Sequence, residues 1–536
     1  LELGFGVARA SASKVEHLQA HWIALPAGHH VSAQVRRLTG FAEADVAIAL
    51  SPEDAWDRLR SATEFAAPMP TAIHFAQFEL PFLRDWAERF EPSHPFPLEP
   101  VWVHAIARRL YPDLPRRSIR ALAGFLGFGL DPARRCLGHV EATAHIWQKI
   151  VPELESRGVR TWHELGDWLT TSPSIPSRSR KRRYPLPSER YRALPDEPGV
   201  YRLLRSNGDI LYIGKAASLR KRVASHFSSV FTRTERALEM LSQVSDVQVT
   251  LTRTALEAAM LENESIKTLQ PPYNVQLLVE DERAWFIDRA LDTIAHTPSD
   301  DHPWGPLPST FGARAFGAVE AILRGAPATR ALRARAVETA ERWAPDEAIF
   351  AAGLAAFVER YEIGGSHGTE NPRRALVETA RRLILTAKVE SPEEDDASAS
   401  DVSELRAWDV PRIVRHLERG VRSGYRLLQR ARWLCLLYES VIVFREPDSE
   451  KTRRLVVSGG RIVDARDALE GSVSPTETAL PLHERRATFD RTQYDRLRTL
   501  TSELKRVLRD GGTVEVRIGR TRWLRGAKLD SILAWV

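Results

Sequence analysis

A β-hairpin can be located in this 536-residue chain from its turn alone. Asn207-Gly208 separates two apolar runs, and this dipeptide is the strongest short-range sequence signal for a hairpin. If the pair forms a two-residue turn, Ser206 faces Asp209, and the pairing of every other position in the two strands follows. The register of the hairpin is therefore predicted together with its place in the chain.

Two tyrosines come together on one face of this hairpin. The register pairs Leu203 with Tyr212 and Tyr201 with Gly214, so the two tyrosines are diagonal neighbours. The opposite face carries the apolar side chains of Val200, Leu204, Leu211 and Ile213. Because side chains alternate between the faces of a strand, we expect the apolar face to pack on the core. Both phenol rings should then point away from that core and reach one ligand.

Two helices after the hairpin add charged side chains. The first should begin after Ser218, and it carries an apolar stripe with a period of four residues, made of Leu219, Val223 and Phe227. Arg222 and His226 then share one flank of this helix, because they are four residues apart. The second helix should open at Thr254.

The second helix places a carboxylate inside an apolar stripe. This stripe consists of Ala255, Ala258, Ala259, Ile266 and Leu269, and Glu262 lies in its middle. A carboxylate in apolar surroundings needs a partner, and a cation is a natural one. Taken alone, a single glutamate is more often a surface residue, so the prediction of a site depends on the whole set.

Together these side chains suit phosphodiester hydrolysis. A divalent ion on Glu262 can polarise a phosphoryl oxygen, while Arg222 and Lys215 neutralise developing charge. A tyrosine or His226 can take a proton from water. Since the ordinary tyrosine pKa is about 10, a tyrosine base needs nearby cations, and Lys215 and Arg222 are expected to lower that pKa.

The motifs resemble a known family. The run PGVYRLLRSNGDILYIGKAASLRKRVASHF and the later run TALEAAMLENESIKTLQPPYNVQL are similar to the GIY-YIG nuclease domain of the excision-repair subunit UvrC and its homologue Cho, over residues 194–277. The resemblance implies a catalytic set of seven residues, namely Tyr201, Tyr212, Lys215, Arg222, His226, Glu262 and Asn274.

The resemblance also assigns roles within that set. Tyr212 is the expected general base, Arg222 the catalytic arginine, and Glu262 the ligand of Mg²⁺ or Mn²⁺. Asn274 corresponds to the asparagine of the closing Tyr-Asn pair. His226 stands where UvrC members carry tyrosine and looks more like the homing-endonuclease branch; a catalytic role and a helix-surface histidine are equally consistent with the sequence.

Composition agrees with a nucleic-acid partner. The net charge of +6 and the pI near 9.3 favour a polyanion, here double-stranded or damaged DNA, although many other proteins are basic. The two cysteines, Cys136 and Cys435, are too few for a cysteine-ligated iron-sulfur cluster or a disulfide framework. With no membrane-length apolar stretch and no signal peptide, we expect a cytoplasmic bacterial protein, with repair-complex proteins as candidate partners.

The sequence before the hairpin predicts a separate α/β domain. Strands are expected at 1–9, 21–25 and 71–75, and helices at 52–63, 80–90, 100–110, 118–126 and 138–151. Three stretches, HVSAQVRRLTGFAEADV, AIHFAQFELPFL and SIRALAGFLGFGLDPARRCLGHVEATAHIW, resemble the proofreading exonuclease of the DNA polymerase III epsilon subunit, which implies a DEDDh-type, RNase H-like fold.

The same stretches lack the chemistry of that exonuclease. The first acidic motif would precede Leu1 and is absent from this chain. At the other motifs the departures are Glu79 for aspartate, Phe75 for asparagine, Arg134 for histidine and His139 for aspartate. Since two-metal catalysis needs those carboxylates and that base, the domain should be inactive.

Positive charge replaces the lost metal ligands of that domain. Arg134, Arg135 and His139 could contact a phosphate, or the pocket could simply have filled with surface side chains. His74 and Glu79 do not make a metal site on their own. A missing N-terminal segment that supplies the first acidic motif would instead give a dual exonuclease and endonuclease.

The expected architecture is an α/β multidomain protein. Its parts are a degenerate RNase H-like domain (1–165), a basic Pro/Ser-rich linker (166–190), a small α/β GIY-YIG domain (191–280), a mainly helical region (281–389), an acidic linker (390–403) and an α+β C-terminal region of unknown role (404–536). The predicted function is a DNA endonuclease of nucleotide-excision-type repair, and the alternative is a non-catalytic DNA-binding scaffold.

Overall fold

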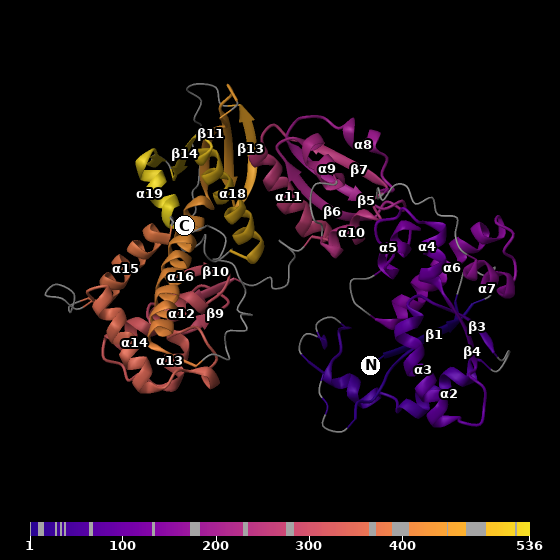
Figure 1. Cartoon of the computed structure of the whole chain (residues 1–536). Coiled ribbons are helices and arrows are strands. Elements are labelled where there is room, and N and C mark those ends of the chain that lie inside the picture. Colours follow the sequence, from indigo (N-terminus) through magenta and orange to yellow (C-terminus); the bar gives the residue numbers. More distant parts are fainter. Residues whose placement is uncertain are drawn as a thin grey trace. The chain divides into compact units, whose positions relative to one another are not determined.

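The chain forms two compact units, Leu1–Gln276 and Leu277–Val536 (Figure 1). Three hydrophobic clusters lie in the first unit, and one large cluster lies in the second. The computed structural model describes residues 2–8, 15–26, 29, 31–32, 35–36, 39–63, 68–130, 135–171, 183–228, 234–274, 284–363, 371–387, 407–447, 449–467, 489–519 and 522–536. Arg134, most of the basic cluster before the nuclease motifs and the acidic linker 390–403 lie outside these residues. No helix of the described part is both long enough and apolar enough to cross a membrane.

The first unit begins with a mixed α/β region. Its elements are β1 (Glu2–Val7), β2 (Glu16–Trp22), the 3-10 helix η1 (Glu43–Ile48), α2 (Pro52–Ser61), β3 (Met69–Ile73), α3 (Ala76–Phe90), β4 (Leu98–Trp102), α4 (Val103–Leu110), α5 (Ile119–Phe125), α6 (Cys136–Glu155) and α7 (Trp162–Thr170). Strands β1 and β2 pair antiparallel, β3 and β4 pair parallel, and α6 packs against β1, β2 and β3. The expected mixture of helices and strands is therefore confirmed.

Several elements of this region differ from the sequence expectation. The strand expected at 21–25 lies earlier, as β2, and the 3-10 helix η1 was not expected. The segment expected to be helical from residue 100 begins as strand β4, and the helix starts at Val103. Helix α7 was not expected, and it extends into the stretch assigned to the linker 166–190. Its Trp168 packs against the core of α4, α5 and α6. Burial of this aromatic ring extends the domain beyond residue 165.

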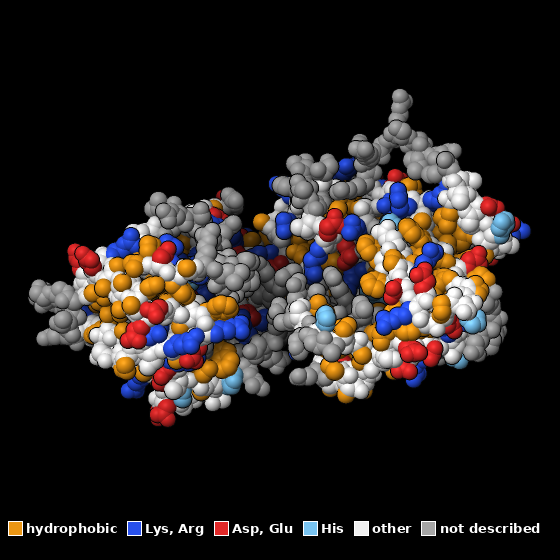
Figure 2. Space-filling model, turned by 60° about the horizontal axis from the view of Figure 1, so that its bottom comes forward, with side chains coloured by type: hydrophobic (Ala, Val, Ile, Leu, Met, Phe, Trp, Pro, Cys, Tyr) orange, Lys and Arg blue, Asp and Glu red, His pale blue; other side chains and the backbone are white. Residues whose placement is uncertain are grey.

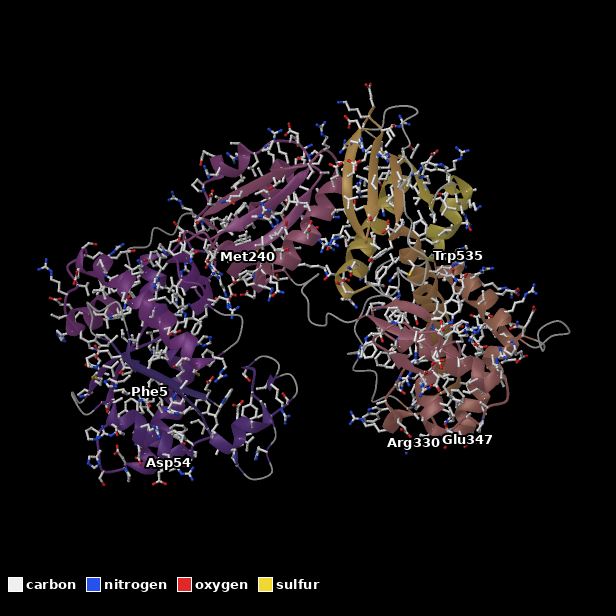
Figure 3. All side chains as sticks on the ribbon, turned by 180° about the vertical axis from the view of Figure 1, so that it is seen from behind. Phe5, Asp54, Met240, Arg330, Glu347 and Trp535 are labelled. Atoms are coloured by element: carbon white, nitrogen blue, oxygen red, sulfur yellow. The ribbon has the colours of Figure 1, made fainter. Side chains whose placement is uncertain are left out.

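The nuclease-like region follows in the same unit. Its elements are α8 (Ser188–Arg192), β5 (Gly199–Leu204), β6 (Ile210–Ala216), α9 (Leu219–Phe227), α10 (Glu235–Leu241), β7 (Asp246–Leu251) and α11 (Ala255–Leu269). The three strands form an antiparallel sheet in the order β6-β5-β7, with α9 and α11 packed against it (Figure 1). Met240 on α10 lies in the core of this region (Figure 3). Sequence reasoning predicted the hairpin, α9 and α11, and missed α8, α10 and β7.

The hairpin has the predicted register but a different turn. The Arg205 N–H donates to the Asp209 carbonyl (2.9 Å) and the Gly208 N–H donates to the Arg205 carbonyl (3.1 Å). The loop therefore has three residues rather than two, and Gly208 provides the required positive φ of 91°.

A bulge in β6 restores the alignment of the strands. Leu204 pairs with Ile210, whereas Leu203 pairs with Tyr212, so one extra residue stands on the β6 side. The one-residue error in the turn is cancelled by this bulge, and the predicted pairing of Tyr201 with Gly214 is confirmed.

The second unit combines a helical part with a sheet. Its elements are β8 (Trp285–Ile287), β9 (Ile294–Ala295), β10 (Trp304–Leu307), α12 (Phe311–Leu323), α13 (Arg330–Ala336), η2 (Glu341–Trp343), α14 (Glu347–Arg360), α15 (Pro372–Ala387), α16 (Val410–Leu437), β11 (Ser440–Arg445), β12 (Arg453–Ser458), β13 (Arg461–Asp467), α18 (Arg491–Arg509), β14 (Thr513–Ile518), β15 (Arg522–Arg525) and α19 (Ala527–Trp535).

The long helix α16 joins both parts of the second unit (Figure 1). It packs against α12, α14 and α15 on one side and also contacts α18 and α19. The sheet has the order β13-β12-β11-β14-β15 and is antiparallel throughout. Ile413 and Leu417 of α16 share one core with α12 to α15. The expected division between 281–389 and 404–536 therefore runs through a single core rather than between two domains.

Candidate active site

Three aromatic side chains meet where the hairpin faces α9. The ring centroids of Tyr201 and Tyr212 lie 6.1 Å apart, and the His226 ring lies 5.6 Å from the first and 5.9 Å from the second. The Tyr201 hydroxyl and the His226 Nε2 share a hydrogen bond of 2.7 Å. The predicted proximity of the two tyrosines is therefore observed, and His226 belongs to the same cluster.

Tyr201 lies inside the core rather than away from it. Its side chain is 0% exposed and packs in a cluster with Leu203, Leu219 and Val223. The expectation that both phenols point away from the core was wrong for Tyr201, because α9 covers its face of the sheet. Burial is also the main cause that raises the Tyr201 pKa above its ordinary value. This hydroxyl is therefore protonated at neutral pH, and it interacts with His226, Arg222 and Tyr212.

Tyr212 is half-buried, and its pKa is also raised. Burial is the larger cause and the Glu262 carboxylate the next, while the Arg222 guanidinium acts in the opposite direction. We expected cations to lower this pKa, but desolvation and the nearby carboxylate outweigh them. The Tyr212 phenol is thus neutral in the protein by itself, and it can act as a base only if the charge around it changes.

Helix α9 presents Arg222 and His226 toward the tyrosines. Ser218 caps this helix, as predicted, because its side chain accepts the N–H of Lys221 at 3.3 Å. The apolar stripe on the other side of the helix is buried, which fixes the rotation of α9. The pKa of Arg222 is raised, mainly by its interaction with Tyr201, while burial acts in the opposite direction. A permanent positive charge therefore stands beside both phenols.

Glu262 reaches the edge of the sheet from α11. The Lys215 N–H donates to its Oε1 at 2.9 Å, so the carboxylate lies beside the strand that carries Tyr212. Thr254 caps α11 as predicted, through a hydrogen bond from the Glu257 N–H at 3.1 Å. Leu269, which was expected in the buried stripe, is exposed.

Asn274 binds the same edge of β6. Its Nδ2 donates to the Ile213 carbonyl at 2.9 Å, and its Oδ1 accepts the Ile213 N–H at 3.0 Å. The preceding Tyr273 N–H donates to the Leu211 carbonyl at 3.1 Å. These contacts hold the strand on both sides of Tyr212. The geometry gives Asn274 a structural task, because both ends of its amide are used by the backbone.

The residues present fit a divalent cation held by few protein ligands. Glu262 is half-exposed and is the acidic side chain that influences Tyr201, Tyr212 and Arg222. The described part of the chain holds no group of three or more His, Cys, Asp or Glu side chains suited to a metal. Mg²⁺ commonly uses one or two carboxylates and completes its shell with water and phosphate oxygens. A single carboxylate beside the phenols is compatible with that mode.

Two side chains of the exonuclease-like stretches, Arg135 and His74, are paired or buried in the N-terminal region. Arg135 forms an ion pair with Glu2 at 3.0 Å and stacks over Trp22 at 4.6 Å, so it is engaged within the protein rather than presented to a phosphate. His74 is buried, and desolvation lowers its pKa to about 4. Desolvation raises the pKa of the Glu79 carboxyl, although the residue as a whole is exposed.

A polar cluster behind the hairpin was missed by sequence reasoning. It consists of Arg205, Glu239, Ser242, Gln243 and Tyr273, and apart from Glu239 these side chains are buried. Nothing in the sequence pattern marks them, because their contacts join segments that are distant in the chain. A polar residue at the end of an apolar strand, such as Arg205, reads as the start of a turn.

Comparisons with known proteins agree with the geometry. Residues 197–275 match the family model of the UvrC-like GIY-YIG domain. The chain is 48% identical to the UvrABC system protein C of Alkalilimnicola ehrlichii over 95 residues, which are 18% of this chain and 15% of that protein. It is 45% identical to the protein of the same name from Nitrosomonas eutropha over 92 residues, which are 17% of this chain and 15% of that protein. The chain therefore carries a UvrC-like GIY-YIG domain.

One relative matches a longer stretch. A Mycobacterium tuberculosis protein, whose name proposes a bifunctional exonuclease/endonuclease, is 29% identical over 304 residues, which are 55% of this chain and 45% of that protein. The likeness thus extends beyond the nuclease domain, and the chain spans less than half the length of these relatives. The magnesium-bound GIY-YIG domain of UvrC from Thermotoga maritima is 31% identical, covering 16% of this chain and 93% of that domain, with a TM-score of 0.15.

Proposed function

We propose that the GIY-YIG domain makes this protein a metal-dependent DNA endonuclease that hydrolyses phosphodiester bonds. The observation that carries the proposal is the meeting of Tyr201, Tyr212 and His226 beside Arg222, with Glu262 on the adjoining strand edge. These side chains come from a hairpin and two separate helices. A purely structural cluster has no need of an arginine and a carboxylate that both act on two phenols.

Glu262 would hold the cation, with Mg²⁺ as the first candidate and Mn²⁺ as the second. When bound, the cation supplies a Lewis acid for a phosphoryl oxygen. Its charge would also offset the carboxylate that raises the Tyr212 pKa, which removes one of the two causes of that shift. Burial still keeps Tyr212 neutral, so the phenol would first give its proton to solvent through the neighbouring His226. The phenolate, stabilised by Arg222, would then take a proton from the attacking water, and Arg222 would also face the developing phosphoryl charge.

The other residues of the predicted set would act around this centre. Tyr201 is fully buried, so it would position His226 rather than touch DNA. His226 could then pass a proton between the two phenols and solvent. Lys215 would add charge at the same strand edge, and Asn274 would hold the strand in place.

The cellular role we propose is nucleotide-excision-type repair of damaged or distorted double-stranded DNA in the cytoplasm. The support is the match to UvrC-like domains and to relatives named UvrABC system protein C. Such a role would involve further repair proteins as partners. On the face drawn in Figure 2, basic side chains occur in several groups interspersed with acidic ones, so no single electrostatic track is marked there.

For the N-terminal region we propose a degenerate RNase H-like fold without exonuclease activity. The parallel pair β3-β4, the packing of α6 on β1 and β3, and the long match to the Mycobacterium tuberculosis protein support the fold. The engagement of Arg135 with Glu2 and the burial of His74 support the loss of activity.

The direct test is incision of supercoiled plasmid and of damaged duplex with Mg²⁺. We expect Tyr212→Phe and Glu262→Gln to lose at least about 100-fold in rate, the first because it removes the general base and the second because it removes the metal ligand. Matched controls are Tyr191→Phe, on a ring stacked against Phe227, and Glu264→Gln, on the exposed side of α11. Full activity of both site variants would refute the proposed site, and inactivity of the wild-type chain on every DNA would favour the scaffold alternative.

A further inference from the structure

The N-terminal region and the nuclease domain meet through a polar interface within the first unit. Helix α5 contacts α10. The Arg116 N–H donates to the Ser242 hydroxyl at 2.9 Å, and the Ser118 hydroxyl donates to Glu239 Oε2 at 2.7 Å. Ser242 is fully buried in this interface. Each hydrogen bond joins residues more than 100 positions apart in the chain, so the contact is specific to the folded pair of regions.

The interface continues into a buried hydrogen-bond chain. Gln243, which is 1% exposed, accepts from Arg205 Nε at 3.0 Å and donates to the Tyr273 hydroxyl at 2.6 Å. The Tyr273 hydroxyl in turn donates to Glu239 Oε1 at 2.9 Å, so the carboxylate bridges Ser118 and Tyr273. A buried polar network in which every member is hydrogen-bonded favours one arrangement of its side chains, because moving one member leaves the others without partners.

Two glycines of the N-terminal region leave space for the hydrogen-bonded side chains. A Cβ on Gly124 would lie 1.9 Å from Gln243 Oε1, and one on Gly129 would lie 2.8 Å from Asp209 Oδ2 and 2.9 Å from Arg205 Nη1. The Gln243 amide could move aside only by giving up its partners at both ends. The absence of a side chain at Gly124 therefore allows the N-terminal region to pack closely against Gln243 of the nuclease domain.

This series of hydrogen bonds ends at β6, the strand that carries Tyr212. The Tyr273 N–H holds the Leu211 carbonyl, and Asn274 holds both backbone groups of Ile213. The side chain of Tyr273 therefore faces the interface, while its backbone and the next residue position the strand on either side of Tyr212. A displacement at α5 has a direct route to the proposed general base.

We infer that the N-terminal region is a positioning element of the nuclease domain. The positioning residues are Gly124 on the N-terminal side of the interface, and Glu239, Gln243 and Tyr273 on the nuclease side. This inference rests on the proposed function of the GIY-YIG domain. The N-terminal region then contributes to DNA incision through the alignment of β6, without contributing a group that touches DNA. This arrangement gives a physical reason for the N-terminal region to remain folded without catalytic residues of its own, because its packing aligns β6.

The test uses two variants of the full chain with two matched controls. Gly124→Ala pushes on Gln243, and Tyr273→Phe removes one hydroxyl while keeping the ring. Gly166→Ala is the control for the first, because Gly166 lies in α7 with nothing within 4 Å of an added Cβ. Tyr191→Phe is the control for the second. The readouts are hydrogen exchange of residues 210–216 without DNA or metal, and the split between kcat and KM in plasmid incision.

We expect exchange across 210–216 to rise and kcat to fall about five- to tenfold in both interface variants, with KM for DNA within twofold of the wild-type value. The two controls should match the wild-type chain in all three quantities. Unchanged exchange in both interface variants would overturn the inference, even if one of them loses activity through misfolding. If the wild-type chain cuts no DNA, the proposed function fails, while the exchange comparison still decides whether the regions are coupled.

Discussion

Replacement of Asn274 by alanine should destabilise the nuclease domain strongly, although the residue contributes a small polar side chain. Its amide satisfies both the N–H and the carbonyl of Ile213, at 3.0 and 2.9 Å, and it is 5% exposed. The variant loses two hydrogen bonds, each contributing about 1 kcal/mol net, and leaves two backbone groups of an edge strand without these partners. We expect a loss of about 2–4 kcal/mol in the free energy of unfolding of this domain.

The matched control is Asn207→Ala, in the exposed hairpin loop. Asn207 also makes two side-chain hydrogen bonds, to the N–H and to the carboxylate of Asp209 at 3.0 and 2.9 Å. Because water can replace both, its loss should cost less than about 1 kcal/mol. The comparison thus holds the number of hydrogen bonds constant and changes their burial.

Hydrogen exchange of residues 199–216 across a urea series would measure this loss separately from the second unit. The measurement is made without DNA or metal, so that any catalytic contribution of Asn274 is excluded. Equal destabilisation by the two variants would refute the reasoning, because the effect would then not depend on burial of the strand edge.

Three further outcomes follow from the site. Burial raises the pKa of Tyr201, so the neutral phenol stabilises the folded state below the ordinary tyrosine pKa of about 10, and this stabilisation is lost as pH rises above it; unfolding midpoints between pH 9 and 11 should fall less steeply in Tyr201→Phe than in the wild-type chain. Desolvation lowers the pKa of His74 from 6.5 to about 4, so the N-terminal region should lose stability as pH falls from 6.5 to 4, measured by its hydrogen exchange, and His74→Gln should remove that dependence. Mg²⁺ should raise the melting temperature of the wild-type chain and leave that of Glu262→Gln unchanged, while EDTA stops cleavage; an equal shift in both proteins would place the ion elsewhere.

The sequence was sufficient for the local features of the site. Helix periodicity predicted the rotation of α9, and with it the shared flank of Arg222 and His226, because burial of an apolar stripe leaves little freedom. The strand register was also predicted, although through a turn of the wrong length that a bulge in β6 compensates. Such compensation cannot be read from the dipeptide Asn207-Gly208 itself.

Features that depend on contact between distant segments were not predictable in this way. The burial of Tyr201 follows from the packing of α9 on the sheet, and the raised pKa of Tyr212 follows first from burial and then from the approach of Glu262 on α11. The sequence left open whether Arg135 contacts a phosphate or is a surface side chain, and in the structure it pairs with Glu2, which is distant from it in the sequence. In each case the local pattern was correct, and the partner was unknown.

Strand β6 lies at the edge of its sheet, and unpaired edges are where chains associate with one another. Here the outward backbone groups at Leu211, Ile213 and Lys215 are occupied by Tyr273, Asn274 and Glu262. The proposed metal ligand and the two residues that position the strand thus also keep the protein from adding strands of its neighbours. Truncation of these side chains should lower the solubility of the protein as well as its DNA cleavage. Both properties therefore depend on the same few residues. Conservative replacements such as Glu262→Gln, which keep an acceptor for the edge, are therefore the cleaner probes of catalysis.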